Sequence, residues 1–166
     1  VLCFESHHLY GQHGPVPEGD YIVPIGVAAV RRKGKDLTIV TCGGMVLKAD
    51  AAAEQLKEKG IDVEIVDLRS LAPLDKETIL KSVAKTRRAI VLDEGPLIGG
   101  LSAEIAAMIQ ENLFSDLQGP VVRIAAQPIP PPHSPPLVDA MIPDVEQIVD
   151  AVMRLAEGGK SHSTRF

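Results

Sequence analysis

The stretch Gly60–Leu74, with the sequence GIDVEIVDLRSLAPL, constrains the fold more than any other part of the chain. Its β-branched residues alternate with acidic ones and predict a strand over Asp62–Asp67, followed by a proline-broken loop. Asp75 is a residue type that caps helices, and the apolar spacing after it predicts a helix ending at Thr86. A strand, a loop and a helix in this order are typical of one unit of a parallel sheet.

The same alternation of strand and helix periods runs along the rest of the chain. Strands are predicted at Val1–Phe4, Leu37–Thr41, Asp62–Asp67, Ala89–Leu92 and Val121–Ala125, with Tyr21–Val30 extended, Arg31–Asp36 a charged turn and Gln127–Pro143 a proline-rich loop. The other helices are predicted at Met45–Lys59, Gly100–Leu117 and Asp144–Ala156, the second with Leu101, Ile105, Met108 and Asn112 facing inward. This order predicts a three-layer α/β fold with a mostly parallel five-stranded sheet and helices on both faces.

Composition narrows the class of protein. A chain of 166 residues, of which 45% are apolar, is typical of one domain. We assign the body of this domain to residues 21–157. We expect a linker and strand from a preceding domain at residues 1–20 and a flexible tail at residues 158–166. A net charge of −5 argues against nucleic acid as a partner, and no apolar run is long enough to span a membrane. The two cysteines, Cys3 and Cys42, fall in predicted strands and form no motif, which favours a reducing, cytoplasmic-type compartment.

Ligands of open α/β sheets usually bind beyond the carboxyl ends of the strands, and Cys42-Gly43-Gly44 lies at one such end. Two glycines there let backbone N–H groups approach an anion at the start of the next helix, and the same position could lower the pKa of Cys42. The spacing matches neither of the common phosphate-binding motifs. A plain tight turn is therefore the leading interpretation, with phosphate binding or a nucleophilic cysteine as alternatives.

Asp93 and Glu94 end another predicted strand, just before Gly99-Gly100. Two carboxylates at this edge could bind a cation or act as an acid and a base. Consecutive residues of an extended chain point to opposite faces, however, so both rarely reach one substrate atom. Helix capping and loop ordering are the simpler interpretation.

The remaining candidates are histidines in loops rich in glycine and proline. His7, His8 and His13 could contribute to a metal site only with further ligands and a rigid frame. His133 lies in the proline-rich loop, where a packing or interface role is the simpler interpretation. Neither a Ser-His-Asp arrangement nor a CxxC pair is present, so the residues alone indicate no assembled active site.

A series of motifs carries a family resemblance. In order along the chain, they are Glu5 with Leu9-Tyr10, Val16-Pro17, Tyr21 with Pro24 and Gly26, Lys35–Val40, Val66–Leu71, Pro73–Asp75, Glu77–Ile79, Asp93-Glu94, Gly99-Gly100, Glu104–Ala106 and Ile142-Pro143. Together they resemble the C-terminal domain of the β subunit of thiamine-diphosphate-dependent 2-oxo acid dehydrogenases, which has the transketolase C-terminal fold. The pyruvate, branched-chain 2-oxo acid and acetoin dehydrogenases are similar.

This resemblance implies a domain for assembly rather than for bond breaking. In the family, thiamine diphosphate and Mg²⁺ are held by the α subunit and by the other domain of the β subunit, so no catalytic, cofactor-binding or metal-binding residue is expected in this chain. The implied partners are a second β subunit, an α subunit and the acyltransferase core, in the cytoplasm or the mitochondrial matrix. The equivalent domain of a transketolase or an oxo acid:ferredoxin oxidoreductase, and a free-standing anion- or nucleotide-binding module, are the alternatives.

One turn departs from the family pattern. The family commonly places an acidic residue in a Leu-acidic-Ala-Pro turn, where its carboxylate pairs with a basic residue of the acyltransferase core. Here residues 117–120 read Leu-Gln-Gly-Pro, so the neutral Gln118 stands at the acidic position. Asp116, two residues earlier, is a candidate substitute. Asp116 and Gln118 are therefore the candidate docking residues. The resemblance implies weaker docking on the core than in the family, because Gln118 is neutral and the extra tail displaces the C-terminal carboxylate that forms a second family contact.

Overall fold

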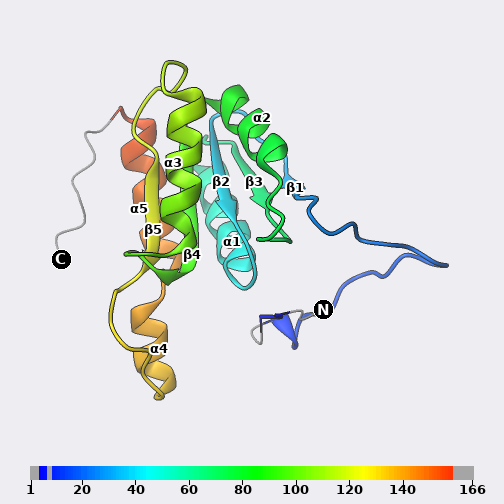
Figure 1. Ribbon diagram of the computed structural model, residues 1–166. Helices are drawn as coiled ribbons and strands as arrows, with labels where there is room; N and C mark the ends of the chain where they lie inside the picture. The colour runs from blue at the N-terminus through cyan, green and yellow to red at the C-terminus, as the bar shows by residue number, and fades with distance from the viewer. Residues whose placement is uncertain (1–3, 7–8, 159–166) are drawn as a thin grey trace.

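The computed structural model describes residues 4–6 and 9–158, and Figure 1 shows its arrangement. Five strands and five helices follow one another along these residues. The strands are β1 (Ala29–Arg32), β2 (Leu37–Thr41), β3 (Val63–Asp67), β4 (Ala89–Pro96) and β5 (Val122–Ala126). The helices are α1 (Met45–Glu58), α2 (Lys76–Thr86), α3 (Leu101–Leu113), α4 (Pro135–Met141) and α5 (Val145–Ala156).

The strands form one five-stranded sheet in the order β1-β3-β2-β4-β5. The pairs β2–β3, β2–β4 and β4–β5 are parallel, and only the edge strand β1 runs antiparallel, against β3. The predicted α/β fold with a mostly parallel five-stranded sheet is therefore confirmed, as are the strands centred on Leu37–Thr41 and on Asp62–Asp67.

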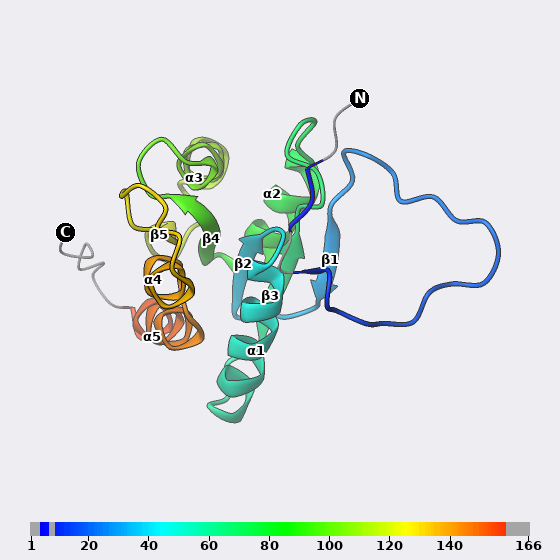
Figure 2. The ribbon, with the colours of Figure 1, turned by 90° about the horizontal axis from the view of Figure 1, so that it is seen from below.

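Helices cover both faces of this sheet. In Figure 2, α2 and α3 lie on one side of the strands, and α1 and α5 on the other. One hydrophobic core lies on the α1–α5 side, where residues of both helices pack against the strand residues Leu37, Ile39, Ile65 and Ile90. A second core lies on the α2–α3 side, where residues of these two helices pack against Val40, Val66 and Val91. Alternate residues of each central strand thus enter opposite cores, because successive side chains of a strand point to opposite faces.

Two helices begin as the sequence predicts. The side chain of Asp75 accepts a hydrogen bond from the backbone N–H of Thr78, and Asp144 forms a capping box with Gln147 at the start of α5. On α5, the side chains of Ile148, Val152 and Leu155 are buried. Caps and apolar spacing therefore locate these two helices.

The predicted charged turn at Arg31–Asp36 is wrong at its start, because Arg31 and Arg32 belong to β1. The strand has an irregular register between Val30 and Arg32. Arg31 forms an ion pair with Asp50 at 3.0 Å, and Arg32 forms one with Glu54, both on α1. In the sequence, the charged residues indicated a solvated turn. In the structure, both arginines belong to the edge strand β1, and their side chains pair with carboxylates of α1.

Two helix predictions also need correction. The segment Gln127–Pro143 contains α4, which has prolines in its first turn, where the missing N–H groups would have no partner in any case. Helix α3 ends at Leu113 rather than Leu117, and Asn112 is exposed instead of facing inward. Its side chain donates a hydrogen bond to the carbonyl of Met108, which explains how a polar residue occupies an apolar register position.

The segment before β1 follows a path away from the sheet and back (Figure 2). Its return is fixed by two hydrogen bonds: the Gly26 N–H donates to Ser70 Oγ at 2.9 Å, and the Ala28 N–H donates to Asp75 Oδ2 at 2.9 Å. Of the segment predicted as extended, Tyr21–Val30, only Ala29 and Val30 belong to a strand, and the residues before them form a loop with a turn at Gly26. Its large apolar side chains are exposed at Tyr21, Ile22, Val23, Ile25 and Val27.

The predicted strand at Val1–Phe4 lies outside the described residues except for Phe4, which is exposed.

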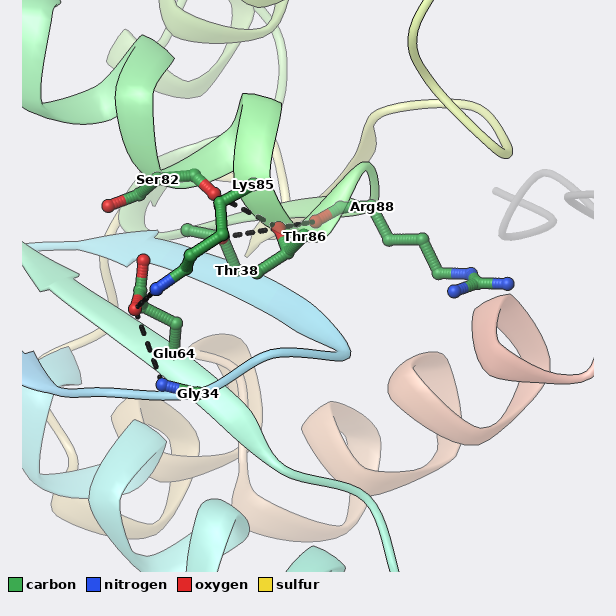
Figure 3. Close-up of polar contacts among 7 residues, drawn as sticks. All are labelled: Gly34, Thr38, Glu64, Ser82, Lys85, Thr86 and Arg88. Carbon is green, nitrogen blue, oxygen red and sulfur yellow. Dashed lines mark hydrogen bonds and ion pairs between the residues drawn. The ribbon is translucent and has the colours of Figure 1, made fainter.

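A network of polar contacts closes the amino end of the sheet (Figure 3). The buried hydroxyl of Thr38 on β2 lies 2.7 Å from that of Thr86, which in turn donates to the carbonyls of Ser82 and Arg88. These contacts satisfy hydroxyl groups that would otherwise be costly to bury, and they fix the end of α2 against β2. Within the described residues, no helix is both long and apolar enough to cross a membrane.

Candidate functional site at the carboxyl end of the sheet

The chain order reverses between β2 and β4, since β3 lies on one side of β2 and β4 on the other. In open α/β sheets a ligand crevice forms at this point, outside the carboxyl ends of the strands. A narrow crevice is found there, and its polar lining consists of Thr41, Cys42, Asp93 and Ser102. The two motifs predicted as candidate sites, around Cys42 and around Asp93, are therefore brought together.

Cys42 does not have the electrostatics of a nucleophile. Burial, together with the nearby carboxylates of Asp93, Glu94 and Asp67, raises the pKa of its thiol to about 12. The thiol is therefore protonated at neutral pH, so the alternative of a nucleophilic Cys42 with a lowered pKa is wrong. Cys42 was predicted to lie in a strand, but it follows the last residue of β2, and its side chain is half-buried. Cys3 lies outside the described residues.

Gly43 and Gly44 form a tight turn. Gly43 has a φ of +58°, a backbone conformation that glycine adopts at little cost, and a Cβ at this position would lie 3.5 Å from Ser6 Cβ and 3.8 Å from Glu94 Oε1. A carboxylate at this distance opposes the binding of a phosphate. The geometry and the charge both favour the plain turn over the phosphate-binding alternative.

Asp93 is buried, whereas its neighbour Glu94 is exposed, as expected for consecutive residues of a strand. The Asp93 carboxylate accepts hydrogen bonds from the backbone N–H groups of Gly95, at 2.9 Å, and Ser102, at 3.2 Å. Gly100, the residue before α3, offers no capping side chain, so Asp93 caps the helix from the neighbouring strand. These bonds support helix capping and loop ordering as the role of Asp93.

Two buried hydroxyl groups line the crevice without a hydrogen-bond partner among the described residues, those of Thr41 and Ser102. The crevice between them leaves no room for a water molecule. Apolar side chains, including Leu68, Leu101 and Ile105, fill the rest of its lining. Within the described residues, this crevice at the switch point of the sheet is thus filled by the chain's own side chains.

Two of the histidine candidates lie in the part of the chain that the structure describes. His13 and His133 are both exposed, and His7 and His8 lie outside the described residues. Among residues 4–6 and 9–158, no cluster of three or more His, Cys, Asp or Glu side chains is arranged to hold a metal ion.

The predicted docking turn lies at the opposite, amino end of the sheet. Asp116 and Gln118 follow α3, and both side chains are exposed. The backbone of this turn is held by Arg87, whose Nε donates to the carbonyl of Asp116 at 2.7 Å and whose own carbonyl accepts from the Gln118 N–H at 2.8 Å. The sequence offered no motif that would have identified Arg87 as the residue that positions this turn.

Comparisons with known proteins agree with this fold. The family model for the transketolase C-terminal domain matches residues 26–148. The β subunit of acetoin:2,6-dichlorophenolindophenol oxidoreductase from Cupriavidus necator is 42% identical over 96% of this chain and 47% of its own length. The β subunit of the pyruvate dehydrogenase E1 component from Porphyra purpurea is 40% identical over 99% of this chain and 50% of its own length.

A solved structure described as a split-gene transketolase, an inactive β4 tetramer, is also similar. It superimposes with a TM-score of 0.69 and 28% identity over 89% of this chain and 47% of its own. The chain thus spans about half the length of the relatives it matches. On the family match and on these relatives, the chain belongs to the family of transketolase C-terminal domains, in the form found in β subunits of 2-oxo acid and acetoin dehydrogenases.

Proposed function

We propose that this chain is the assembly and docking domain of the β subunit of a thiamine-diphosphate-dependent 2-oxo acid or acetoin dehydrogenase. The observation that carries the proposal is the filled crevice at the carboxyl end of the sheet. There, Cys42 is protonated and Asp93 is committed to capping α3. Because the crevice that the described residues form at the switch point is filled, we assign this domain a role through its surfaces.

The intact enzyme would decarboxylate a 2-oxo acid, or cleave acetoin, and pass the acyl group to a lipoyl group. Its cofactors would be thiamine diphosphate and Mg²⁺. The residues of this chain do not fit the diphosphate, because Asp67, Asp93 and Glu94 all lie close enough to Cys42 to raise its pKa and would repel an anion. We therefore assign no step of the reaction to a side chain of this domain.

A second β subunit and an α subunit are the partners that we assign to the domain, with an acyltransferase core as the further partner. Self-association is supported by the exposed apolar residues between Tyr21 and Val27, which a solvated loop would not require. It is also consistent with the similar transketolase chain, which is described as a β4 tetramer. Sedimentation equilibrium of the purified chain should show dimers or larger species, and a monomer at all concentrations would contradict this assignment.

A transketolase is the second candidate function, favoured by the structural similarity to the split-gene enzyme. The dehydrogenase subunits are more similar in sequence, at 42% and 40% identity against 28%. This difference places the dehydrogenases first.

A chimeric β subunit tests the proposed function. This chain would replace the matching half of the β subunit of the Cupriavidus necator acetoin oxidoreductase, which would then be expressed with its natural partner subunit. We expect assembly at the size of the natural enzyme together with acetoin-dependent reduction of dichlorophenolindophenol. As a control, the matching half of the split-gene transketolase would be transferred in the same way. A chimera that stays unassembled, or that behaves no better than the control, would contradict the proposal.

A further inference from the structure

The carboxyl end of the sheet carries negative charge that the domain itself does not neutralise. Asp67, Asp93 and Glu94 all lie close enough to Cys42 to raise the pKa of its thiol. In the part of the chain that the structure describes, none of these three carboxylates forms an ion pair. Backbone N–H groups donate hydrogen bonds to Asp67 and to Asp93. Glu94 is exposed and has no such bond among the described residues, so its charge is the least compensated.

Glu94 faces a buried hydroxyl group across the Gly43 turn. The point at which a Cβ on Gly43 would lie is 3.8 Å from Glu94 Oε1 and 3.8 Å from Ser6 Oγ. Ser6 Oγ is buried and has no hydrogen-bond partner within the described ranges. A carboxylate oxygen and an unsatisfied hydroxyl oxygen therefore flank one point, which glycine leaves without a side chain of its own.

Two further hydroxyl groups without a partner lie at the same end of the sheet. Thr41, the last residue of β2, is 1% exposed, and Ser102, whose N–H bonds to Asp93, is 0% exposed. A buried polar group without a partner is uncommon in proteins and calls for an ion or a water molecule as its explanation. The carboxyl end thus combines uncompensated charge with unsatisfied oxygen atoms, and these two observations are independent of each other.

Oxygen ligands of this kind select a hard cation. Carboxylate oxygens and water suit Mg²⁺ and related divalent ions, whereas the protonated thiol of Cys42 offers no ligand to a softer metal such as zinc. Within the described residues, no three His, Cys, Asp or Glu side chains are arranged around one ion. The ion would therefore keep several of its water molecules, as Mg²⁺ commonly does when one or two carboxylates bind it.

We propose that a hydrated divalent cation such as Mg²⁺ binds beside the Gly43 turn, held by the carboxylate of Glu94 and the hydroxyl of Ser6. Asp67 and Asp93 strengthen the binding through their charge without contacting the ion. The bound ion joins residues 4–6 to strand β4 and to the turn before α1. Every residue that the site uses belongs to this chain, so the proposal does not rest on the proposed function.

Paramagnetic Mn²⁺, a divalent ion that takes the same oxygen ligands, tests the location of the site. NMR of the full chain would follow the loss of amide signals during a titration with MnCl₂. We expect the signals of Gly43, Gly44 and Glu94 to broaden first, and excess MgCl₂ to restore them. Glu94→Gln should weaken binding at least about tenfold, since it removes the one charged ligand. Glu58→Gln changes an exposed carboxylate at the far end of α1 and is the matched control, which should bind as the natural chain does.

Cys42 reports on the same ion in a second measurement. In a Cys3→Ser variant, MgCl₂ should speed alkylation of Cys42 at least about twofold over KCl of equal ionic strength, because a cation beside the carboxylates lowers the raised pKa. Half of this effect should appear at about 1 mM Mg²⁺, the weak range expected for a site with one charged ligand. Ser6→Ala should raise that concentration about threefold or more, through loss of its hydrogen bond to the hydrated ion.

Broadening spread over the surface carboxylates without preference for Gly43 would show an adventitious ion only and would overturn the proposal. Broadening that persists in Glu94→Gln, or an unchanged affinity in Ser6→Ala, would contradict the assigned ligands. No effect of either ion would also reject the site and would leave a basic side chain of a partner protein as the counter-charge. Circular dichroism of each variant would establish that it is folded.

Discussion

The buried carboxylate of Glu64 on β3 forms an ion pair with Lys85 near the end of α2. The carboxylate is almost wholly inaccessible to solvent, while the lysine side chain is about half exposed, and the Gly34 N–H donates a further hydrogen bond to Glu64 at 3.3 Å. This pair lies beside the hydroxyl network in Figure 3 and joins β3 and α2 to the turn before β2. Polar contacts thus join the elements at the amino end of the sheet, and among the described residues Lys85 is the one cation paired with the buried Glu64 carboxylate.

Lys85→Ala should lower the free energy of unfolding by about 1–3 kcal/mol, because it leaves the Glu64 carboxylate buried without a counter-charge. Urea denaturation at neutral pH measures this loss. Lys81→Ala, an exposed position on the same helix, should change the stability by less than about 0.5 kcal/mol. Adding Glu64→Gln to Lys85→Ala should recover part of the loss, since the buried charge is then removed. Fully additive losses would show that the ion pair is not the cause.

Gly34→Ala should destabilise the domain by about 3 kcal/mol or more, because the inserted methyl group has no space. Its Cβ would lie 2.2 Å from the carbonyl carbon of Val63 and 2.3 Å from the Glu64 nitrogen, both of them backbone atoms of β3. Gly11→Ala is the control, since no atom lies within 4 Å of the Cβ added there. Thermal unfolding compares the two variants. Equal melting temperatures would contradict the close approach of this turn to β3.

Asp75 predicts a pH-dependent contribution to stability. Its hydrogen bonds from Thr78 and from Ala28 lower the pKa of the carboxyl group below its ordinary value of 3.8. Because the folded-state pKa is lowered, the stabilisation is fully present above the ordinary value and is lost as the pH falls through the folded value.

Asp75→Ala should therefore cost about 1–2 kcal/mol at pH 7, as for loss of a helix cap, and much less once the pH is well below 3.8. Denaturation of both proteins across this range measures the difference. Asp20→Ala, in the exposed loop, should show no such dependence. A loss that stays constant down to the lowest pH at which the protein folds would exclude the carboxylate as its source.

Cys42 should be slow to alkylate. With a pKa of about 12, the thiol supplies very little thiolate at pH 8. The greater intrinsic nucleophilicity of a basic thiolate offsets part of this, so iodoacetamide should react at least about thirtyfold more slowly than with a free thiol. The measurement uses a Cys3→Ser variant, in which Cys42 is the only cysteine. The same variant in urea should react at the ordinary rate, and fast alkylation of the folded protein would refute the raised pKa.

The sequence predicted the parts of the fold that depend on local patterns. The alternation at Asp62–Asp67 and the cap at Asp75 both correspond to observed elements, because each is set by residues close together in the chain. The placement of Arg31 and Arg32 in β1 could not be predicted in this way, since their partners Asp50 and Glu54 lie on a helix about twenty residues further on.

For the candidate sites as well, features set by local geometry were predictable, whereas features set by contacts between distant residues were not. The opposite orientations of Asp93 and Glu94 follow from strand geometry and were predicted. The raised pKa of Cys42 was not, because it arises from carboxylates that only the topology brings near the thiol. Likewise, the contact from Arg87 to the Asp116 carbonyl joins two helix ends that are far apart in the chain.

The central claim is that this domain contributes surfaces rather than a cofactor site. Calorimetric titration of the purified chain with thiamine diphosphate and Mg²⁺ tests it most directly. We predict no measurable heat of binding at micromolar concentrations, because the crevice that the described residues form at this end of the sheet is filled and lies beside the carboxylates of Asp67, Asp93 and Glu94. Saturable binding with micromolar affinity would contradict it.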